Sequence, residues 1–217
     1  DEDIDGFSSI SDFSQSLDMK KGVYARRYLW KTSDGRRLEL CFERFASMYD
    51  IHKIGQRITI KALDKIDNLS VAALLDSDVT NLNLVSGEPL PVQPGRNHFI
   101  SRNVKPNTLS VTLDDPDSTV LSFAQQTFAY LNGKAVTGRI TTNSKACGTT
   151  YICSLNKNDV FTLEKIIYAV TSLDSDLDAE KAIEEFLSKP VSYEQEFSNH
   201  CSSLSEKWRI ADIEIDT

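Results

Sequence analysis

Short apolar stretches separated by turn residues run along most of this chain, and this pattern constrains its fold more than any other feature. The clearest example is GQRITIKALDKIDNLSVAALLDSD, from Gly55 to Asp78. It contains two predicted strands, Arg57–Leu63 and Leu69–Leu75, and the second leads into the acidic residues Asp76 and Asp78. Because side chains alternate across a strand, we expect Ile58, Ile60, Val71, Ala73 and Leu75 to face a core.

Further predicted strands precede and follow this pair. Val23–Phe45 is typical of a hairpin, with Ser33-Asp34-Gly35 as a tight turn that uses glycine for its positive φ. Later candidates are Asn81–Val85, His98–Val104, Thr108–Leu113, Val120–Tyr130, Val136–Thr142 and Thr149–Leu155. Many short strands at this spacing indicate a sandwich or a barrel. We therefore expect a mainly β protein, a single jelly-roll-like β-sandwich.

The pattern changes near the C-terminus. Phe161–Leu173 and Asp178–Leu187 have helical spacing, with Asp176 or Asp178 as an N-cap, and Tyr193–Leu204 is a weaker helix. Arg209–Ile215 alternates like a late edge strand. The expected organisation is an acidic flexible arm (1–18), a β-sandwich core (19–158), a helical segment packed on the core (159–204) and an acidic tail (205–217).

Charge is segregated along the chain. The net charge is −8, yet residues 19–154 hold eighteen Lys and Arg against twelve Asp and Glu. Local patches rather than net charge attract a phosphate backbone, so this middle region is compatible with a polyanionic partner. The four cysteines form no close pair, and no apolar run is long enough to span a membrane, so the expected location is intracellular.

The motifs of common enzymes are not found in the sequence. There is no GxSxG, GxGxxG or Walker loop, and the three histidines have no catalytic partner beside them in sequence. A zinc site would require Cys147, Cys153, His200 and Cys201 to converge. Asp174, Asp176, Asp178 and Glu185 match positions of a calcium loop, but Ala179 replaces its turn glycine and an acidic helix start explains the same residues. We expect a non-enzymatic protein with no cofactor, no metal and no small-molecule substrate.

The hairpin combines cations with aromatic residues. Its candidate nucleic-acid-binding residues are Lys20, Lys21, Arg26, Arg27, Arg36, Arg37, Tyr28 and Trp30. Single-stranded nucleic acid is bound through base stacking and phosphate contacts, for which these residue types are suited. The alternative is a solvated strand face whose aromatic residues belong to the core.

The order of elements resembles the plant viral movement proteins of the "thirty-K" superfamily, from about Tyr49 to Phe197. The strand end Leu74-Leu75-Asp76 matches the family's Asp after a hydrophobic strand, and Pro106-Asn107 matches its Pro-Asn. Glu180–Val191 is similar to its acidic helix. Asp78, where a basic residue often stands, and the acidic end ADIEIDT depart from the pattern.

This resemblance implies a self-associating protein that binds single-stranded RNA and carries a viral genome through plasmodesmata, with host membrane or cell-wall proteins as further partners. It also implies that Asp76 is a buried, hydrogen-bonded structural anchor. Two alternatives stay open, a viral structural protein (jelly-roll capsid subunit or matrix protein) and a β-sandwich adaptor that binds protein partners.

Overall fold

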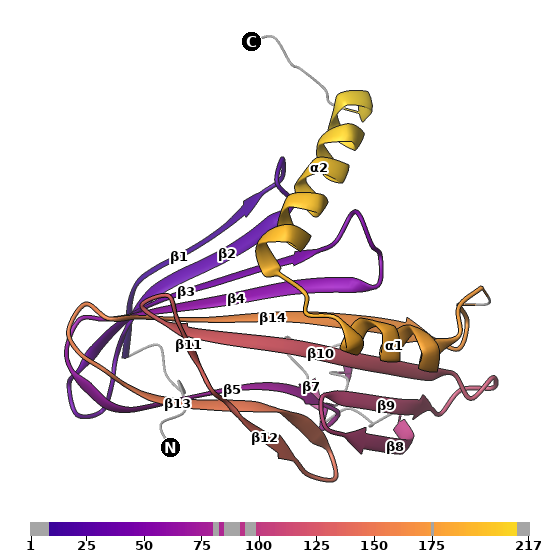
Figure 1. Ribbon diagram of the computed structural model, residues 1–217, viewed down its shortest axis with the longest axis horizontal. Helices are drawn as coiled ribbons and strands as arrows, with labels where there is room; N and C mark the ends of the chain where they lie inside the picture. Colours follow the sequence, from indigo (N-terminus) through magenta and orange to yellow (C-terminus); the bar gives the residue numbers. More distant parts are fainter. Residues whose placement is uncertain (1–8, 80–82, 85–91, 94–98, 175, 212–217) are drawn as a thin grey trace.

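Two antiparallel sheets face each other in the computed structural model, which describes residues 9–79, 83–84, 92–93, 99–174 and 176–211 (Figure 1). The large sheet has the order β1 (Ile10–Asp18), β2 (Val23–Lys31), β3 (Arg37–Ala46), β4 (Lys53–Ala62), β14 (Val160–Thr171), β10 (Val120–Leu131), β9 (Thr108–Leu113) and β8 (Phe99–Lys105), and β11 (Lys134–Val136) also pairs with β10. The small sheet consists of β12 (Arg139–Thr142), β13 (Ala146–Leu155) and β5 (Ile66–Asp76). A separate pair, β6 (Asn83–Leu84) and β7 (Val92–Gln93), completes the strands.

The main core lies between the two sheets. Leu38, Leu155 and Phe161 are among its fully buried side chains. Ile60, Ala73 and Leu75 are buried as the strand alternation predicts, whereas Ile58 and Val71 are partly buried and pack against the same core. The mainly β, sandwich-like architecture expected from the sequence is therefore confirmed.

Two helices cover the outer face of the large sheet, the face opposite the small sheet. α1 (Ala179–Ser188) packs on β10 and β14, and α2 (Tyr193–Ala211) contacts β4 and β14 before it extends beyond the sheet (Figure 1). Asp178 is the N-cap of α1, as predicted, because its carboxylate accepts a hydrogen bond from the Lys181 N–H at 3.1 Å. No helix within these described ranges is long and apolar enough to cross a membrane.

The predicted helix at Phe161–Leu173 is wrong, because Val160–Thr171 forms β14 in the middle of the large sheet. This strand pairs with β4 on one side and β10 on the other. Both of its faces are covered, one by the small sheet and one by the helices, so apolar residues do not alternate strictly with polar ones. An apolar run of this kind cannot be told from a buried helix by periodicity alone.

Both ends of the described chain also differ from expectation. Residues 10–18, predicted to be a flexible arm, form β1 and pair with β2. Residues 209–211, predicted to start an edge strand, are the last turn of α2. The parts of the predicted arm and tail at 1–8 and 212–217 lie outside the described residues.

The topology differs from a jelly roll. A jelly roll divides eight strands between two Greek keys, whereas β1 to β4 follow one another as a simple meander in a nine-stranded sheet. The neighbouring strands β4 and β5 do not pair with each other. They lie in opposite sheets, so the connection between them crosses the sandwich.

Candidate functional site

A groove of about 630 Å³ lies on the outer face of the large sheet, between α1, β14 and the β3–β4 turn. We call it the outer groove. Its walls are strongly charged and hold both signs, with Asp50, Lys53, Tyr168, Asp176, Asp178, Lys181, Glu185 and Lys189 among the lining residues. Phe186, which is buried, closes it on the side of α1.

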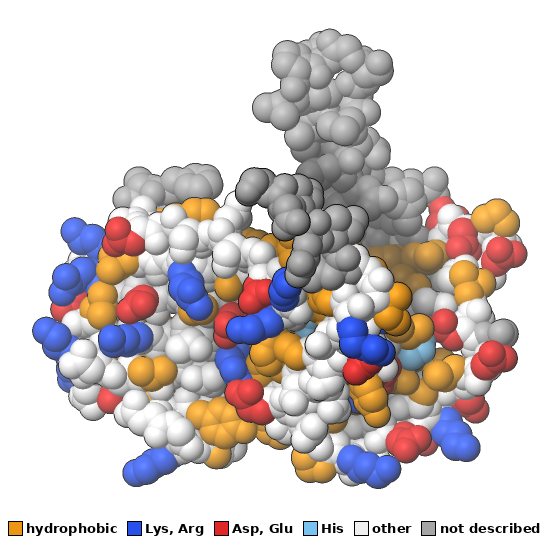
Figure 2. All heavy atoms as spheres, turned by 90° about the horizontal axis from the view of Figure 1, so that it is seen from above, with side chains coloured by type: hydrophobic (Ala, Val, Ile, Leu, Met, Phe, Trp, Pro, Cys, Tyr) orange, Lys and Arg blue, Asp and Glu red, His pale blue; other side chains and the backbone are white. Residues whose placement is uncertain are grey.

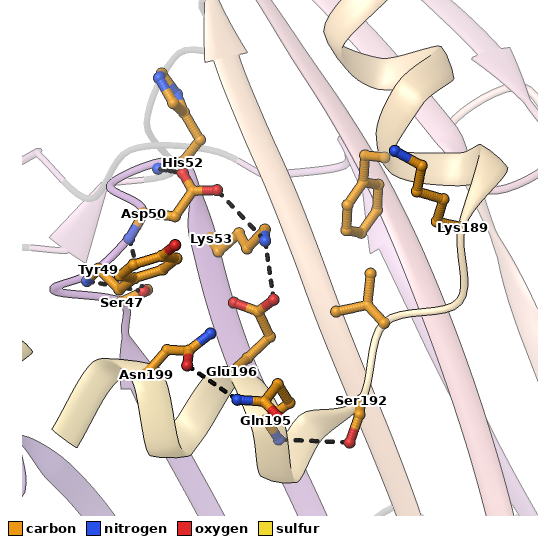
Figure 3. Close-up of polar contacts among 12 residues, drawn as sticks. Ser47, Tyr49, Asp50, His52, Lys53, Lys189, Ser192, Gln195, Glu196 and Asn199 are labelled. Carbon is orange, nitrogen blue, oxygen red and sulfur yellow. Dashed lines mark hydrogen bonds and ion pairs between the residues drawn. The ribbon is translucent and has the colours of Figure 1, made fainter. Parts of the chain in front are cut away.

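Lys53 is the central charge of this region. Its Nζ lies 2.9 Å from Glu196 Oε1 in α2 and 3.4 Å from Asp50 Oδ2 in the β3–β4 turn (Figure 3). Burial lowers the pKa of Lys53, but Glu196 and, to a lesser extent, Asp50 outweigh this effect and hold it above the ordinary value. The result is an ion pair that joins α2 to the sheet with little solvent around it.

Three further contacts fasten α2. The Arg57 guanidinium forms ion pairs with Glu164 and Glu194 and lies 3.9 Å from the Tyr193 ring centroid. The buried His200 accepts a hydrogen bond from the Met48 N–H at Nδ1, and its Nε2 lies 2.8 Å from the Lys21 carbonyl oxygen. The Trp208 indole N–H donates to the Met19 carbonyl at 3.0 Å. The direction of α2 is therefore set along most of its length.

The calcium and zinc candidates do not assemble into metal sites. No group of three or more His, Cys, Asp or Glu residues that could hold a metal ion is found in the part of the chain that the structure describes. The four calcium candidates serve other purposes: Asp174 accepts from the Thr171 N–H, Asp178 caps α1, Glu185 pairs with Lys189, and Asp176 lines the outer groove. Cys147 and Cys153 lie in β13, whereas His200 and Cys201 belong to α2 on the other side of the large sheet.

The cations of the hairpin do not form one surface. Arg26 stacks over Phe42 at 4.8 Å on the face that carries the core, whereas Arg27 is exposed and bonds Cys41. At the opposite end of the strands Arg36 pairs with Asp34 and Asp67, and Arg37 pairs with Asp64. On the face seen in Figure 2, Lys and Arg side chains lie among Asp and Glu.

The remaining candidates of the hairpin are also not arranged for base stacking. Tyr28 is buried in the core and Trp30 is half-buried against it. Lys21 Nζ lies 3.8 Å from Asp18 Oδ2, and Lys20 also contacts another group of the protein. A continuous strip of cations and exposed aromatic rings is therefore not formed by these residues.

Asp76 is not the buried anchor that we expected. It is exposed at the end of β5, where its carboxylate accepts from the Asp78 N–H at 2.8 Å. The neighbouring Ser77 is the buried polar group, because its hydroxyl donates to the Lys145 carbonyl and accepts from Arg102. Adjacent side chains of a strand point to opposite faces, so Ser77 rather than Asp76 faces the interior at this strand end.

The other motif residues contribute their backbone. The Leu74 side chain is exposed, and its carbonyl accepts from Lys165 Nζ at 2.7 Å. Pro106-Asn107 forms the β8–β9 turn, in which Asn107 has a φ of 61° and its carbonyl accepts from the Gln125 N–H. Both carbonyls thus bond residues that the sequence did not single out.

Lys165 and Gln125 are polar residues inside the sandwich that sequence reasoning missed. Lys165 is 8% exposed, and burial lowers its pKa to about 8, with Cys147 opposing the shift. Gln125 is 1% exposed, and its amide donates to the Ala73 carbonyl at 3.1 Å. The available signal was a polar residue at a strand position whose alternation points into the sandwich, and buried polar groups of this kind call for a partner.

The comparisons with known proteins point to a carbohydrate-active enzyme family. Residues 3–207 match the model described as glycosyl hydrolase family 65, N-terminal domain. Kojibiose phosphorylase of Halothermothrix orenii is 23% identical over 222 residues, a match that spans 95% of this chain and 27% of that protein. A solved structure, a putative kojibiose phosphorylase from human microbiome, has a TM-score of 0.67 at 16% identity and covers 92% of this chain and 25% of that one.

These findings overturn the functional predictions from the sequence. The resemblance to viral movement proteins is wrong, because the family model covers nearly the whole chain. The predicted RNA partner, plasmodesmal transport and viral structural role are wrong for the same reason. The expectation of a non-enzymatic protein without a small-molecule substrate is contradicted too, because the family and its relatives are named for enzymes that act on sugars. The chain spans about a quarter of the relatives that it matches.

Proposed function

This chain belongs to glycosyl hydrolase family 65 as its N-terminal domain, and we propose that it is the positioning domain of a longer enzyme that cleaves a glycosidic bond with phosphate. The names of its relatives, kojibiose phosphorylases, suggest the substrate class, a sugar together with inorganic phosphate. The reacting groups then belong to the other three quarters of the protein.

The way α2 is fastened carries this proposal. Four separate contacts, through Lys53, Arg57, His200 and Trp208, hold one helix against the large sheet and its turns. A surface helix with so many specific polar contacts has a defined direction. Because the family model describes an N-terminal domain, we infer that α2 helps to hold the sandwich in one orientation relative to the rest of a longer protein.

The charges of the outer groove support a role in positioning rather than in chemistry. Glycosidic bond cleavage by hydrolases commonly uses two carboxyl groups that flank the substrate. In this groove, Asp50 is paired with Lys53, Asp178 caps α1, and Glu185 is paired with Lys189. These carboxylates therefore already have structural partners.

The test measures phosphate-dependent cleavage of kojibiose by the longer protein that contains this chain and by the 217-residue chain alone. We expect activity in the longer protein only, and a fall in kcat when Lys53 and Arg57 are both replaced by Met to loosen α2. Turnover by the 217-residue chain alone would show that the chain holds the reacting groups. An unchanged kcat in the folded double variant would contradict the positioning role.

A further inference from the structure

A second groove, of about 460 Å³, lies at a gap in the large sheet, and we call it the gap groove. The segment from β11 to β12 crosses from the large sheet to the small sheet beside it (Figure 1). Gly138 in this crossing lies so close to the small sheet that a Cβ there would approach Thr149 Cγ2 within 2.3 Å. The groove is thus an open depression bordered by both sheets, the crossing segment and Leu187 of α1.

The gap exposes a short stretch of the β10 backbone. Pairing of β10 with β9 ends at Ala124, and pairing with β11 begins at Ala129. The Gln125 N–H donates to the Asn107 carbonyl, on the edge of β10 that faces away from β14. In an antiparallel strand every second residue directs its N–H and carbonyl to the same edge, so those of Thr127 also face away from β14. Tyr151 hydroxyl donates to the Thr127 carbonyl at 2.9 Å, which leaves the Thr127 N–H directed at the groove without a neighbouring strand.

Gln125 is a buried amide that lines the same groove. It is 1% exposed, and its Nε2 bonds the Ala73 carbonyl. Its Oε1 is buried and has no hydrogen-bond partner among the described residues. Unpaired buried acceptors are rare and require an explanation, such as a ligand or a bound water.

The lining of the gap groove contains no charged side chain. Its polar groups are amides and hydroxyls: Gln125, Thr127, Thr149 and Tyr151 line it from the side of the small sheet. Gln126, Phe128 and Tyr130 belong to the opposite face of β10, where the Gln126 amide already donates to the Phe186 and Lys189 carbonyls. A volume of this size lies within the usual range for small-molecule sites, about 300 to 1,000 Å³. Such walls suit an uncharged ligand that offers hydroxyl groups and an apolar face.

We infer that the gap groove binds a neutral saccharide unit, with a sugar oxygen accepting from the Thr127 N–H beside the buried amide of Gln125. This goes beyond the proposed function, because it assigns a ligand to the sandwich domain itself. A phosphorylated sugar is disfavoured, since no cation in the lining would pair with its phosphate.

The test titrates the 217-residue chain with glucose, kojibiose and glucose 1-phosphate by calorimetry, and follows the Thr127 amide by NMR. We expect saturable binding of a neutral sugar, a shift of the Thr127 amide, and weaker binding of glucose 1-phosphate. Ala135→Trp, at an exposed position on the rim, fills the groove and should weaken binding at least about tenfold. Ala72→Trp is the matched control, at an exposed strand position outside the groove.

Three results would overturn the inference. They are the lack of saturable binding by either neutral sugar, equal affinity of the Ala135→Trp and Ala72→Trp variants, and binding of glucose 1-phosphate that is as tight as that of glucose. If Ala135→Trp does not fold, the NMR shift of the Thr127 amide in the parent chain is the deciding measurement. A sugar that binds elsewhere would not move the Thr127 amide signal, and that result would also overturn the inference. The measurement does not require the longer enzyme to be active.

Discussion

The two faces of the large sheet satisfy their polar groups in different ways. On the outer face, charged side chains form ion pairs: Lys53 pairs with Glu196 and Asp50, and Arg57 pairs with Glu164. In the interior, Lys165 and Gln125 donate to the carbonyls of Leu74 and Ala73 in the facing sheet. The outer face therefore gains a rigid attachment for α2, whereas the interior retains a buried amide oxygen that has no hydrogen-bond partner among the described residues.

The interior arrangement depends on close approach at Gly148, and its replacement gives the largest expected effect. A Cβ at this position would lie 2.0 Å from the Ala73 carbonyl oxygen and 2.8 Å from Gln125 Nε2. Since the first contact is with backbone, Gly148→Ala should lower the free energy of unfolding by about 3 kcal/mol or more. Urea denaturation measures this. Gly133→Ala, where nothing lies within 4 Å, is the control and should lose about 1 kcal/mol through its positive φ.

The outer face should respond to loss of a single ion. Lys53→Met leaves Glu196, whose side chain is 10% exposed, without its cation, and we expect a loss of about 3 kcal/mol in unfolding free energy. The double variant Lys53→Met, Glu196→Leu should recover much of that loss. Lys189→Met is the control, because its pair with Glu185 is exposed and should contribute less than about 1 kcal/mol. Equal losses in Lys53→Met and Lys189→Met would erase the distinction between a buried and an exposed pair.

Lys165 gives the interior a pH dependence of its own. Its folded-state pKa of about 8 lies below the ordinary 10.5, so the unfolded chain binds more protons between these values. Stability from this group therefore rises with pH from about 8 to 10.5, by about 3 kcal/mol in total. Thermal unfolding of the parent and of Lys165→Met across this range isolates the effect. A parallel pH profile in the two proteins would contradict it.

The smallest expected effect concerns α1, which borders the outer groove. Asp178→Ala removes the N-cap and should lower the unfolding free energy by about 1 kcal/mol. Asp176→Ala, on the same approach to the helix but without a capping bond, serves as the reference. Chemical denaturation of both variants compares them, and equal stability would show that Asp178 does not stabilise the helix start.

Much of this fold follows from local sequence signals. The hairpin β2–β3 forms around Gly35, which has a φ of 86°, and α1 begins after the predicted cap Asp178. Strands β9 and β10 lie close to their expected positions. Turn glycines, capping carboxylates and strict alternation depend only on neighbours within a few residues, so they can be predicted from the sequence.

The functional site was less accessible to sequence reasoning. The basic residues of the hairpin predicted one surface, but strand alternation separates Arg26 from Arg27, and carboxylates from the β4–β5 region neutralise Arg36 and Arg37. Short motifs such as Leu74-Leu75-Asp76 occur in unrelated β proteins, which is why they led to the wrong family. Only a comparison over the whole chain distinguished between families.

By itself, the sequence determined that the chain is mainly β, where many of its turns lie, and that α1 starts at a capping aspartate. The tertiary structure decided that Val160–Thr171 is a strand, because its pairing with β4 and β10 joins residues about a hundred and about forty positions away. It also decided that Lys53 pairs with Glu196, 143 residues later. It decided as well that the missing side chain of Gly148 leaves room for the Gln125 amide to reach the facing sheet. Such contacts depend on which strands, far apart in the sequence, become neighbours in the fold. A pattern that extends over a few adjacent residues does not specify those neighbours.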